Sequence, residues 1–259
     1  MNDCLQIRIQ EGGGPTLIYL PGTHGDWTLN GAFRREVNGR ARLVEFTFPR
    51  TLEWSLVDYA NAIEQKLIAN KIEQGWILAE SFASQVAWVW VGQNSKQFKI
   101  EGIILAGGFV RHPIIPAVRL AIFLTRHIPA ALLKSILWFY TIYARSREGD
   151  SAEIRADLQE FIQRRTPADL RASAHRLDLI AQNDLRSIAR ATKIPVFYLT
   201  GLIDPIVPWP LVQPWLKKNC PGYRGWKIIF SSDHHVLGAA KKSASQILQS
   251  SSTNFRMIE

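Results

Sequence analysis

The stretch from Trp76 to Trp90 constrains the fold of this chain more than any other part of the sequence. It opens with an apolar run short enough for a buried strand, and it ends in an apolar run that suits a buried helix. Ser81 lies between the two runs, with alanine two residues before it and two residues after it. Small flanking residues suit a sharp strand-to-helix turn, which lifts a serine hydroxyl above the sheet and points the helix N-terminus at it. We interpret Ser81 as a candidate nucleophile; a strand end with a helix-capping serine is the alternative.

Strand patterns alternate with helical patterns along much of the rest of the chain. The expected strands are 5–9, 16–20, 42–48, 100–106, 193–201 and 226–230, and the expected helices are 27–37, 55–70 and 239–249. This alternation predicts an α/β fold, with a mainly parallel sheet covered by helices on both faces.

The alternation stops between residues 109 and 191. Prolines punctuate an apolar region there, and polar-apolar helical patterns follow at 152–164 and 167–190. Charged residues and a proline interrupt the apolar region below the ~20 residues that a membrane span needs. We therefore expect an α/β core formed by 1–108 and 192–259, and a helical lid inserted at 109–191. The alternative for the insertion is a helical subdomain with an ordinary core.

Length and composition are those of an ordinary globular protein. The 259 residues allow one large domain or two small ones, and 47% of them are hydrophobic. Cys4 and Cys220 are far apart in sequence and provide neither metal-ligand spacing nor a disulfide framework, which fits a reducing compartment. The N-terminus has no apolar segment of the secretory kind, so we expect a cytoplasmic protein. We find no metal or nucleotide motif, and we expect no cofactor and no metal.

The net charge is +9, and part of the excess lies in residues 108–190. A solvated basic face is one interpretation. Attraction to an anionic partner is the other, for example an acidic lipid, a phosphate-bearing substrate or an acidic carrier protein. No nucleic-acid-binding motif is present, so we expect no nucleic-acid partner.

A serine nucleophile needs a base within hydrogen-bond reach, and a carboxylate best orients that base. Asp204 follows the expected strand 193–201, and His234 follows the expected strand 226–230. Open parallel sheets place their sites at such strand ends. The order Ser, Asp, His therefore predicts a catalytic set. Two alternatives remain: Asp204 only starts a turn, or His235 takes the place of His234.

These motifs resemble those of the α/β-hydrolase superfamily over nearly the whole chain. The resemblance rests on Leu20–Thr23, Ala79–Ala83, Gly201–Pro208 and Asp233–Leu237. The Ala-Glu-Ser-Phe turn and the early Leu-Pro-Gly are similar to those of small bacterial esterases and thioesterases.

The resemblance implies roles for single residues. Ser81 would be the nucleophile, Asp204 the orienting acid and His234 the base. The backbone amides of Thr23 and Phe82 would form the oxyanion hole. The chain departs from the family pattern in having Ala-x-Ser-x-Ala instead of Gly-x-Ser-x-Gly, and Pro-Gly instead of His-Gly before the oxyanion residue.

The resemblance also implies an activity, namely hydrolysis of a carboxylic ester or thioester through an acyl-enzyme. The apolar lid suits a small-molecule substrate with an acyl or aromatic group. Two alternatives stay open: an acyltransferase that uses the same triad, and a non-catalytic ligand-binding protein that keeps the fold. The sequence leaves the acyl chain length, the leaving group and the oligomeric state open.

Overall fold

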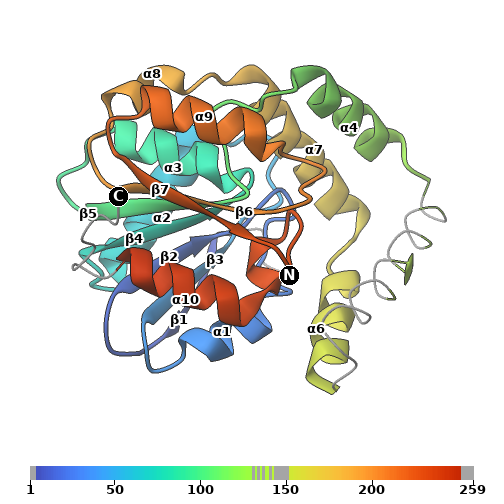
Figure 1. The fold of residues 1–259 in the computed structure, drawn as a ribbon. Helices are drawn as coiled ribbons and strands as arrows, with labels where there is room; N and C mark the ends of the chain where they lie inside the picture. The colour runs from blue at the N-terminus through green and yellow to red at the C-terminus, as the bar shows by residue number, and fades with distance from the viewer. Residues whose placement is uncertain are drawn as a thin grey trace.

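A single sheet organises the computed structural model of the protein (Figure 1). The structure describes residues 4–129 and 152–251, together with Leu132, Ser135, Trp138, Phe139 and Ile142. In this part of the chain the strand order is β1-β3-β2-β4-β5-β6-β7. The strands are β1 (Gln6–Gln10), β2 (Thr16–Leu20), β3 (Arg42–Thr47), β4 (Gln74–Glu80), β5 (Lys99–Ala106), β6 (Val196–Gly201) and β7 (Tyr223–Ile229).

All strand pairs of the sheet are parallel except one. The edge strand β1 runs antiparallel to β3, and the remaining neighbours pair in parallel. The carboxyl ends of β2, β4, β5, β6 and β7 therefore share one edge of the sheet. The predicted α/β fold with a mainly parallel sheet is confirmed.

Helices cover both faces of this sheet. The helices of the described residues are α1 (Gly31–Val37), α2 (Leu56–Ala69), α3 (Ala83–Gly92), α4 (Ile115–His127), α6 (Ala152–Gln163), α7 (Pro167–Gln182), α8 (Arg186–Ala191), α9 (Trp209–Asn219) and α10 (Ala240–Ser251), with a short 3-10 helix η1 (Val236–Gly238). Helices α2, α3, α8 and α9 lie on one face of the sheet, and α1 and α10 lie on the other (Figure 1).

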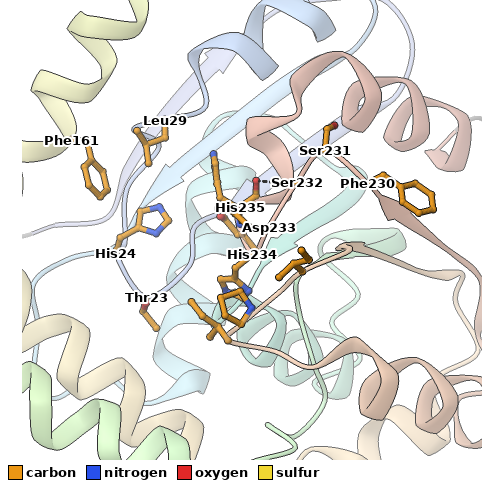
Figure 2. A pocket seen from close by; sticks show the side chains of 14 residues that line it. Thr23, His24, Leu29, Phe161, Phe230, Ser231, Ser232, Asp233, His234 and His235 are labelled. Atoms are coloured by element: carbon orange, nitrogen blue, oxygen red, sulfur yellow. Dashed lines mark hydrogen bonds and ion pairs between the residues drawn. The ribbon is translucent and has the colours of Figure 1, made fainter. Parts of the chain in front are cut away.

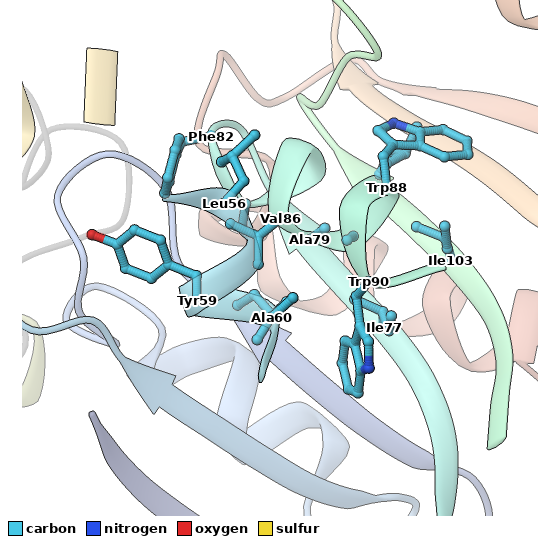
Figure 3. Close-up of a cluster of buried hydrophobic side chains, with 14 of the residues drawn as sticks. Leu56, Tyr59, Ala60, Ile77, Ala79, Phe82, Val86, Trp88, Trp90 and Ile103 are labelled. Carbon is cyan, nitrogen blue, oxygen red and sulfur yellow. The ribbon is translucent and has the colours of Figure 1, made fainter. Parts of the chain in front are cut away.

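The strands supply one hydrophobic core to each face, because successive side chains of a strand point to opposite sides. In β4, Ile77 packs with α2 and α3, whereas Leu78 packs with α1 and α10. The larger core holds the two indoles of α3, Trp88 and Trp90, which have no exposed surface (Figure 3). The buried apolar run after Ser81 is thus a helix in the core, as predicted.

Capping boxes fix the N-termini of two helices. The Ser55 hydroxyl accepts a hydrogen bond from the Asp58 amide, and the Asp58 carboxylate accepts one from the Ser55 amide. Thr166 and Asp169 form the same pair at the start of α7. Such a cap contributes about 1 kcal/mol to helix stability. Ser55 is the N-cap of α2, so the helix expected at 55–70 is confirmed.

Two element boundaries differ from the prediction for local reasons. Helix α1 begins at Gly31 and not at Trp27, because Thr28 donates to the Asp26 carboxylate and Leu29 has a φ of 71°, which together form a turn. The helical pattern at 167–190 corresponds to two helices, α7 and α8. The Asp184 carboxylate accepts a hydrogen bond from the Arg186 amide, and α8 begins there as a separate helix.

Helix α9 is absent from the sequence-based prediction. It contains two prolines, Pro210 in its first turn and Pro214 inside it. Proline is compatible with a first turn but breaks hydrogen bonds in a helix interior, so the pattern did not indicate a helix. Val212 and Leu216 are buried against the larger core and hold the helix in place.

The insertion between β5 and β6 contains α4, α6, α7 and α8, and α4 packs along α7 (Figure 1). Much of the predicted apolar stretch 130–144 lies outside the described residues. Within the described residues, no helix has both the length and the apolar character that a membrane crossing requires. The lid function and the boundaries 109 and 191 stay predictions.

Candidate active site

Ser81 occupies the sharp turn between β4 and α3. Its φ of 50° is in the left-handed region, which costs a residue other than glycine about 1–3 kcal/mol. Several contacts hold the turn. The Ser81 amide donates to the Ala106 carbonyl at 3.0 Å, and the Ser84 hydroxyl donates to the Ser81 carbonyl at 2.6 Å. The flanking alanines, Ala79 and Ala83, have no exposed surface and leave no room for larger side chains.

The structure brings Ser81, His234 and Asp204 into one line of hydrogen bonds. His234 Nε2 lies 2.8 Å from Ser81 Oγ, and His234 Nδ1 lies 2.8 Å from Asp204 Oδ2. Because a carboxylate only accepts hydrogen bonds, the ring proton is on Nδ1, and Nε2 is free to accept from the serine hydroxyl. The arrangement has the geometry of an activated nucleophile, its base and an orienting acid.

The loop after β6 fixes the direction of the Asp204 carboxylate. Its other oxygen, Oδ1, accepts the backbone amides of Ile206 at 2.9 Å and Val207 at 2.8 Å. The side chain has no exposed surface, whereas that of His234 is 16% exposed. Asp204 therefore forms a turn and also contacts the His234 ring; its role as the catalytic acid stays a prediction.

Gly107, directly after β5, allows the histidine loop to approach the sheet. Its φ is 59°, and a Cβ at this position would lie 3.0 Å from the His234 carbonyl oxygen and 3.2 Å from His234 Nδ1. A side chain here would strain the backbone and displace the imidazole.

The loop after β2 passes beside the nucleophile. A Cβ built on Gly22 would lie 3.4 Å from the Ser81 Cβ, so Thr23 follows at the edge of the site. Phe82 comes directly after Ser81 at the N-terminus of α3, and its ring is buried in the larger core. Phe82 therefore follows Ser81 directly, and the loop that carries Thr23 passes close to Ser81; the role of the two residues as amide donors stays a prediction.

Side chains of helix α7, in the insertion, donate hydrogen bonds to backbone carbonyl groups beside the candidate site. Arg176 is only 2% exposed, and it donates from Nη1 to the Thr23 carbonyl and from Nη2 to the Pro49 carbonyl, each at 2.8 Å. Ser173 Oγ donates to the same Thr23 carbonyl at 3.0 Å. The sequence-based prediction missed both residues, because an arginine or serine on a helix normally indicates a solvated face.

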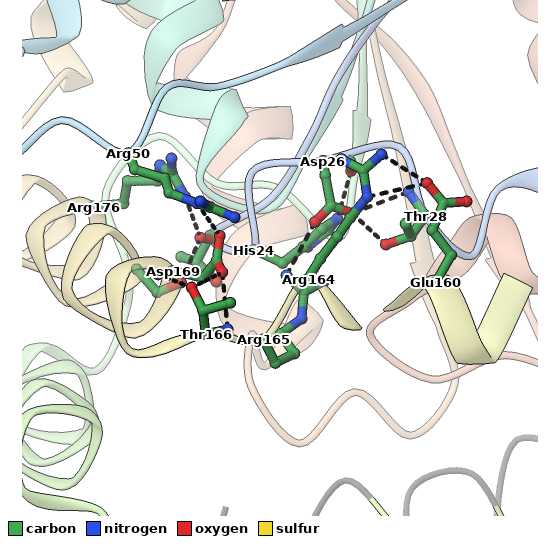
Figure 4. Close-up of polar contacts among 12 residues, drawn as sticks. His24, Asp26, Thr28, Arg50, Glu160, Arg164, Arg165, Thr166, Asp169 and Arg176 are labelled. Carbon is green, nitrogen blue, oxygen red and sulfur yellow. Dashed lines mark hydrogen bonds and ion pairs between the residues drawn. The ribbon is translucent and has the colours of Figure 1, made fainter. Parts of the chain in front are cut away.

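A buried ion pair joins the insertion to the same loop a second time. Arg165 Nη1 lies 3.0 Å from Asp26 Oδ2, and the two side chains are 9% and 7% exposed (Figure 4). Burial alone would raise the pKa of the Asp26 carboxyl, but the charge of Arg165 and the hydrogen bond from Thr28 outweigh it and lower that pKa. Asp26 is therefore a buried carboxylate that the insertion neutralises.

A second carboxylate-histidine pair consists of Glu80, which precedes Ser81, and His235, which follows His234. His235 Nδ1 donates to Glu80 Oε1 at 2.9 Å, and the Tyr19 hydroxyl donates to Glu80 Oε2. Burial opposes ionisation of Glu80, but the hydrogen bond from His235 and its charge dominate and lower the pKa to about 2. An acid inside a buried strand is the sequence signal for this pair. Since His235 binds Glu80, His234 is the histidine that contacts Ser81.

The candidate site adjoins a cavity of about 760 Å³ at the carboxyl edge of the sheet (Figure 2). Polar residues of its lining include His24, Asp233 and His234, and apolar residues include Leu29 and Phe161. This volume is within the usual range for a small-molecule site. Among the described residues, no group of three or more His, Cys, Asp or Glu side chains is placed to hold a metal ion.

Comparison with solved structures identifies the fold. The chain is similar to an esterase from Exiguobacterium antarcticum, with a TM-score of 0.74, 14% identity and 94% of each chain covered. It is also similar to an enol-lactonase from Burkholderia xenovorans, with a TM-score of 0.75, 14% identity and 95% of each chain covered. The protein has the α/β-hydrolase fold.

A further similar structure is MenH from S. aureus, with a TM-score of 0.73, 13% identity, and 94% of this chain and 97% of that chain covered. No protein-family model and no curated protein matches the sequence. At such low identity these similarities establish the fold alone, and the chemistry must be argued from the site.

Proposed function

We propose that this protein is a serine hydrolase that cleaves a carboxylic ester or thioester through an acyl-enzyme on Ser81. The observation that carries the proposal is the hydrogen-bond line from Asp204 through His234 to Ser81, with both distances at 2.8 Å. The three side chains come from loops that follow β6, β7 and β4 at one edge of the sheet. Buried, mutually oriented groups of this kind are characteristic of catalytic sites.

In the first half-reaction, Ser81 Oγ attacks the acyl carbonyl carbon while its proton moves to His234 Nε2. Asp204 keeps the ring in the required tautomer and stabilises the imidazolium. The carbonyl oxygen becomes an oxyanion, which the Thr23 and Phe82 amides would bind at about 3 kcal/mol per donor. The imidazolium then returns its proton to the leaving alcohol or thiol, and the C–O or C–S bond breaks.

In the second half-reaction, water takes the place of the leaving group. His234 Nε2 accepts a proton from the water, the hydroxide attacks the acyl carbon, and the proton passes back to Ser81 Oγ as the acid leaves. The reaction needs no redox partner, and every proton it moves passes through Nε2 of one imidazole.

The wall of the cavity supports an acyl substrate with an apolar chain or ring. Leu29 comes from the loop after β2, Phe161 from α6, and Ile203 and Ile206 from the loop after β6. Because the insertion contributes Phe161, we also propose that residues 109–191 act as the lid of this cavity. A lining that combines apolar side chains with a few polar groups suits a substrate that is apolar away from its ester carbonyl.

Labelling with a fluorophosphonate probe followed by peptide mapping tests the proposal. We expect an adduct on Ser81 that is lost in Ser81→Ala and in His234→Ala, because the probe reacts only with an activated serine. Ser231→Ala is the matched control, since Ser231 is a serine that lines the same cavity and is not part of the line of hydrogen bonds from Asp204 to Ser81. Turnover of p-nitrophenyl esters should follow the labelling.

A folded wild-type protein without an adduct on Ser81, or ester turnover that survives in Ser81→Ala, would contradict the proposal. In the first case the non-catalytic ligand-binding alternative takes its place. Product analysis with water and with an added alcohol or thiol as acceptors separates hydrolysis from acyl transfer.

A further inference from the structure

Helix α4 of the insertion has two apolar faces, and only one of them is buried. Val118 and Ile122 are 4% and 8% exposed and face the side on which α4 packs along α7. Leu120, Phe123 and Leu124 are 58%, 58% and 55% exposed. Their spacing places these three side chains on one stripe of the helix. A contiguous stripe of large apolar side chains in water marks an interaction surface.

The exposed apolar side chains continue on both sides of α4. The described positions that follow it, Leu132, Trp138, Phe139 and Ile142, are between 46% and 64% exposed. In the loop before it, His112 Nε2 donates to the Ile206 carbonyl at 3.1 Å and ties α4 to the loop of Asp204. Ile206 is 55% exposed and lines the cavity. The loop that precedes α4 is therefore attached to the rim of the candidate active site.

The charge of this region has one sign. From Gly102 to Arg147 the sequence contains no Asp or Glu, and it contains six basic residues: Arg111, Arg119, Arg126, Lys134, Arg145 and Arg147. Arg119 and Arg126 lie on α4 itself and are exposed, next to the apolar stripe. Arg126 pairs with Asp178 of α7, but Arg119 has no ion pair among the described residues. The face combines apolar side chains with unneutralised positive charge.

We propose that the exposed face of α4, formed by Arg119, Leu120, Phe123 and Leu124, docks the protein onto a lipid surface that carries negative charge. Apolar side chains of a helix that lies in the plane of a bilayer enter the boundary between headgroups and acyl chains, and the arginines beside them bind the phosphates. Arginine suits this position because its apolar stem follows the hydrocarbon while the guanidinium stays among the headgroups. Docking in this way would bring the cavity rim at Ile206 near the membrane.

This interaction does not depend on the chemistry of Ser81. A bilayer is favoured over a soluble acidic partner because the apolar stripe and the positive charge occupy the same helix face. An acidic protein surface would satisfy the charge but would leave three large apolar side chains exposed to its polar groups.

Sedimentation with lipid vesicles tests the inference. We expect the wild-type protein to bind vesicles of phosphatidylcholine mixed with phosphatidylglycerol at least about tenfold more tightly than vesicles of phosphatidylcholine alone. Salt should weaken this binding because it screens the surface potential. Phe123→Glu and Arg119→Glu should each reduce the binding about tenfold or more. Ile68→Glu, at a 39% exposed position of α2, is the matched control and should bind as the wild type does.

Several outcomes would overturn the inference. They are the absence of vesicle binding, equal binding to both vesicle types, and binding that Phe123→Glu leaves unchanged. A fourth is a wild-type dimer that Phe123→Glu dissociates, since the apolar face would then be covered by a second copy of the chain. Fluorophosphonate labelling without vesicles separates this inference from the proposed function: all variants should label on Ser81 at the wild-type rate, which also reports that they are folded.

Discussion

Arg176 of α7 donates a hydrogen bond of 2.8 Å to the carbonyl oxygen of Thr23, one of the two residues whose amides we propose to bind the oxyanion. The carbonyl and the amide of Thr23 belong to different peptide units. A change in the conformation of the loop would nevertheless reorient both of them. Arg176 and Ser173 together occupy this carbonyl, so α7 sets the direction in which the loop after β2 presents its amides. The insertion is thus attached to the loop that carries Thr23, which we propose to be part of the oxyanion hole.

Arg176→Lys should therefore lower kcat about 10- to 100-fold with little change in KM, because lysine cannot reach both Thr23 and Pro49 and a small displacement of an oxyanion donor weakens binding of the transition state. Ser173→Ala should have the same effect on a smaller scale. Steady-state kinetics on a p-nitrophenyl ester and the rate of fluorophosphonate labelling measure it. A rise in KM at constant kcat, or lower thermal stability with unchanged kinetics, would show that Arg176 only supports the fold.

Gly25→Ala should destabilise the protein more than Gly39→Ala does. Both glycines have positive φ, 78° and 70°, so both substitutions carry the same backbone strain. At Gly25 the new Cβ would lie 2.4 Å from Arg176 Nη1, whereas at Gly39 nothing lies within 4 Å. We expect about 1 kcal/mol of lost stability at Gly39 and about 2–4 kcal/mol at Gly25, measured by urea unfolding. Equal losses would mean that the loop moves away from Arg176 without cost.

Asp204→Asn should reduce kcat about 10³- to 10⁴-fold while the protein stays folded. Asparagine can still accept hydrogen bonds from the amides of Ile206 and Val207. Its NH₂ group would then face His234 Nδ1 and favour the tautomer in which the ring proton is on Nε2. Asp233→Asn is the control, since the Asp233 carboxylate accepts a hydrogen bond from the His235 amide at 3.0 Å in the same loop as His234. Comparable losses in the two variants would argue that Asp204 only shapes its loop.

Glu80→Gln should change how stability depends on pH. The folded-state pKa of Glu80 is about 2 and the unfolded value is about 4.3, so the folded state binds fewer protons between these values. Its contribution, on the order of 3 kcal/mol, is complete above about pH 5 and is lost as the pH falls toward 2. The wild-type protein should therefore have a larger free energy of unfolding than Glu80→Gln at pH 7. This difference between the two proteins should be smaller at pH 3.

Urea unfolding at pH 7, 5 and 3 measures this change, with Glu73→Gln at an exposed position beside β4 as the control. If the difference in free energy of unfolding between the wild type and Glu80→Gln stayed constant over the three pH values, it would contradict the lowered pKa of Glu80.

Most of the fold was predictable because its signals are local. Each buried strand is a short apolar run, and the alternation of strands and helices is enough to predict a parallel sheet. The small residues around Ser81 predicted the turn that its φ of 50° requires. The exception is α9, where tertiary burial of Val212 and Leu216 outweighs two prolines, and no local pattern reports that balance.

The site was predictable only in part, for a different reason. Ser81, Asp204 and His234 each follow a strand, so a shared sheet edge brings them together without further information. Arg176 and Thr23 are 153 residues apart, and nothing near either residue indicates the other. The Glu80–His235 pair is an intermediate case: a glutamate in a buried run needs a partner, but the sequence does not say which one.

The attachment of α7 to the loop after β2 also bears on how such an enzyme changes its substrate over evolution. Recombination that exchanged the whole insertion would remove Arg165, Ser173 and Arg176 together and release the loop beside Ser81. Exchange limited to the stretch from α4 to α6 would replace Phe161 in the cavity lining. It would keep Arg165, Ser173 and Arg176. The permissive crossover point for chimaeras therefore lies before Arg165, and α7 is inherited with the core.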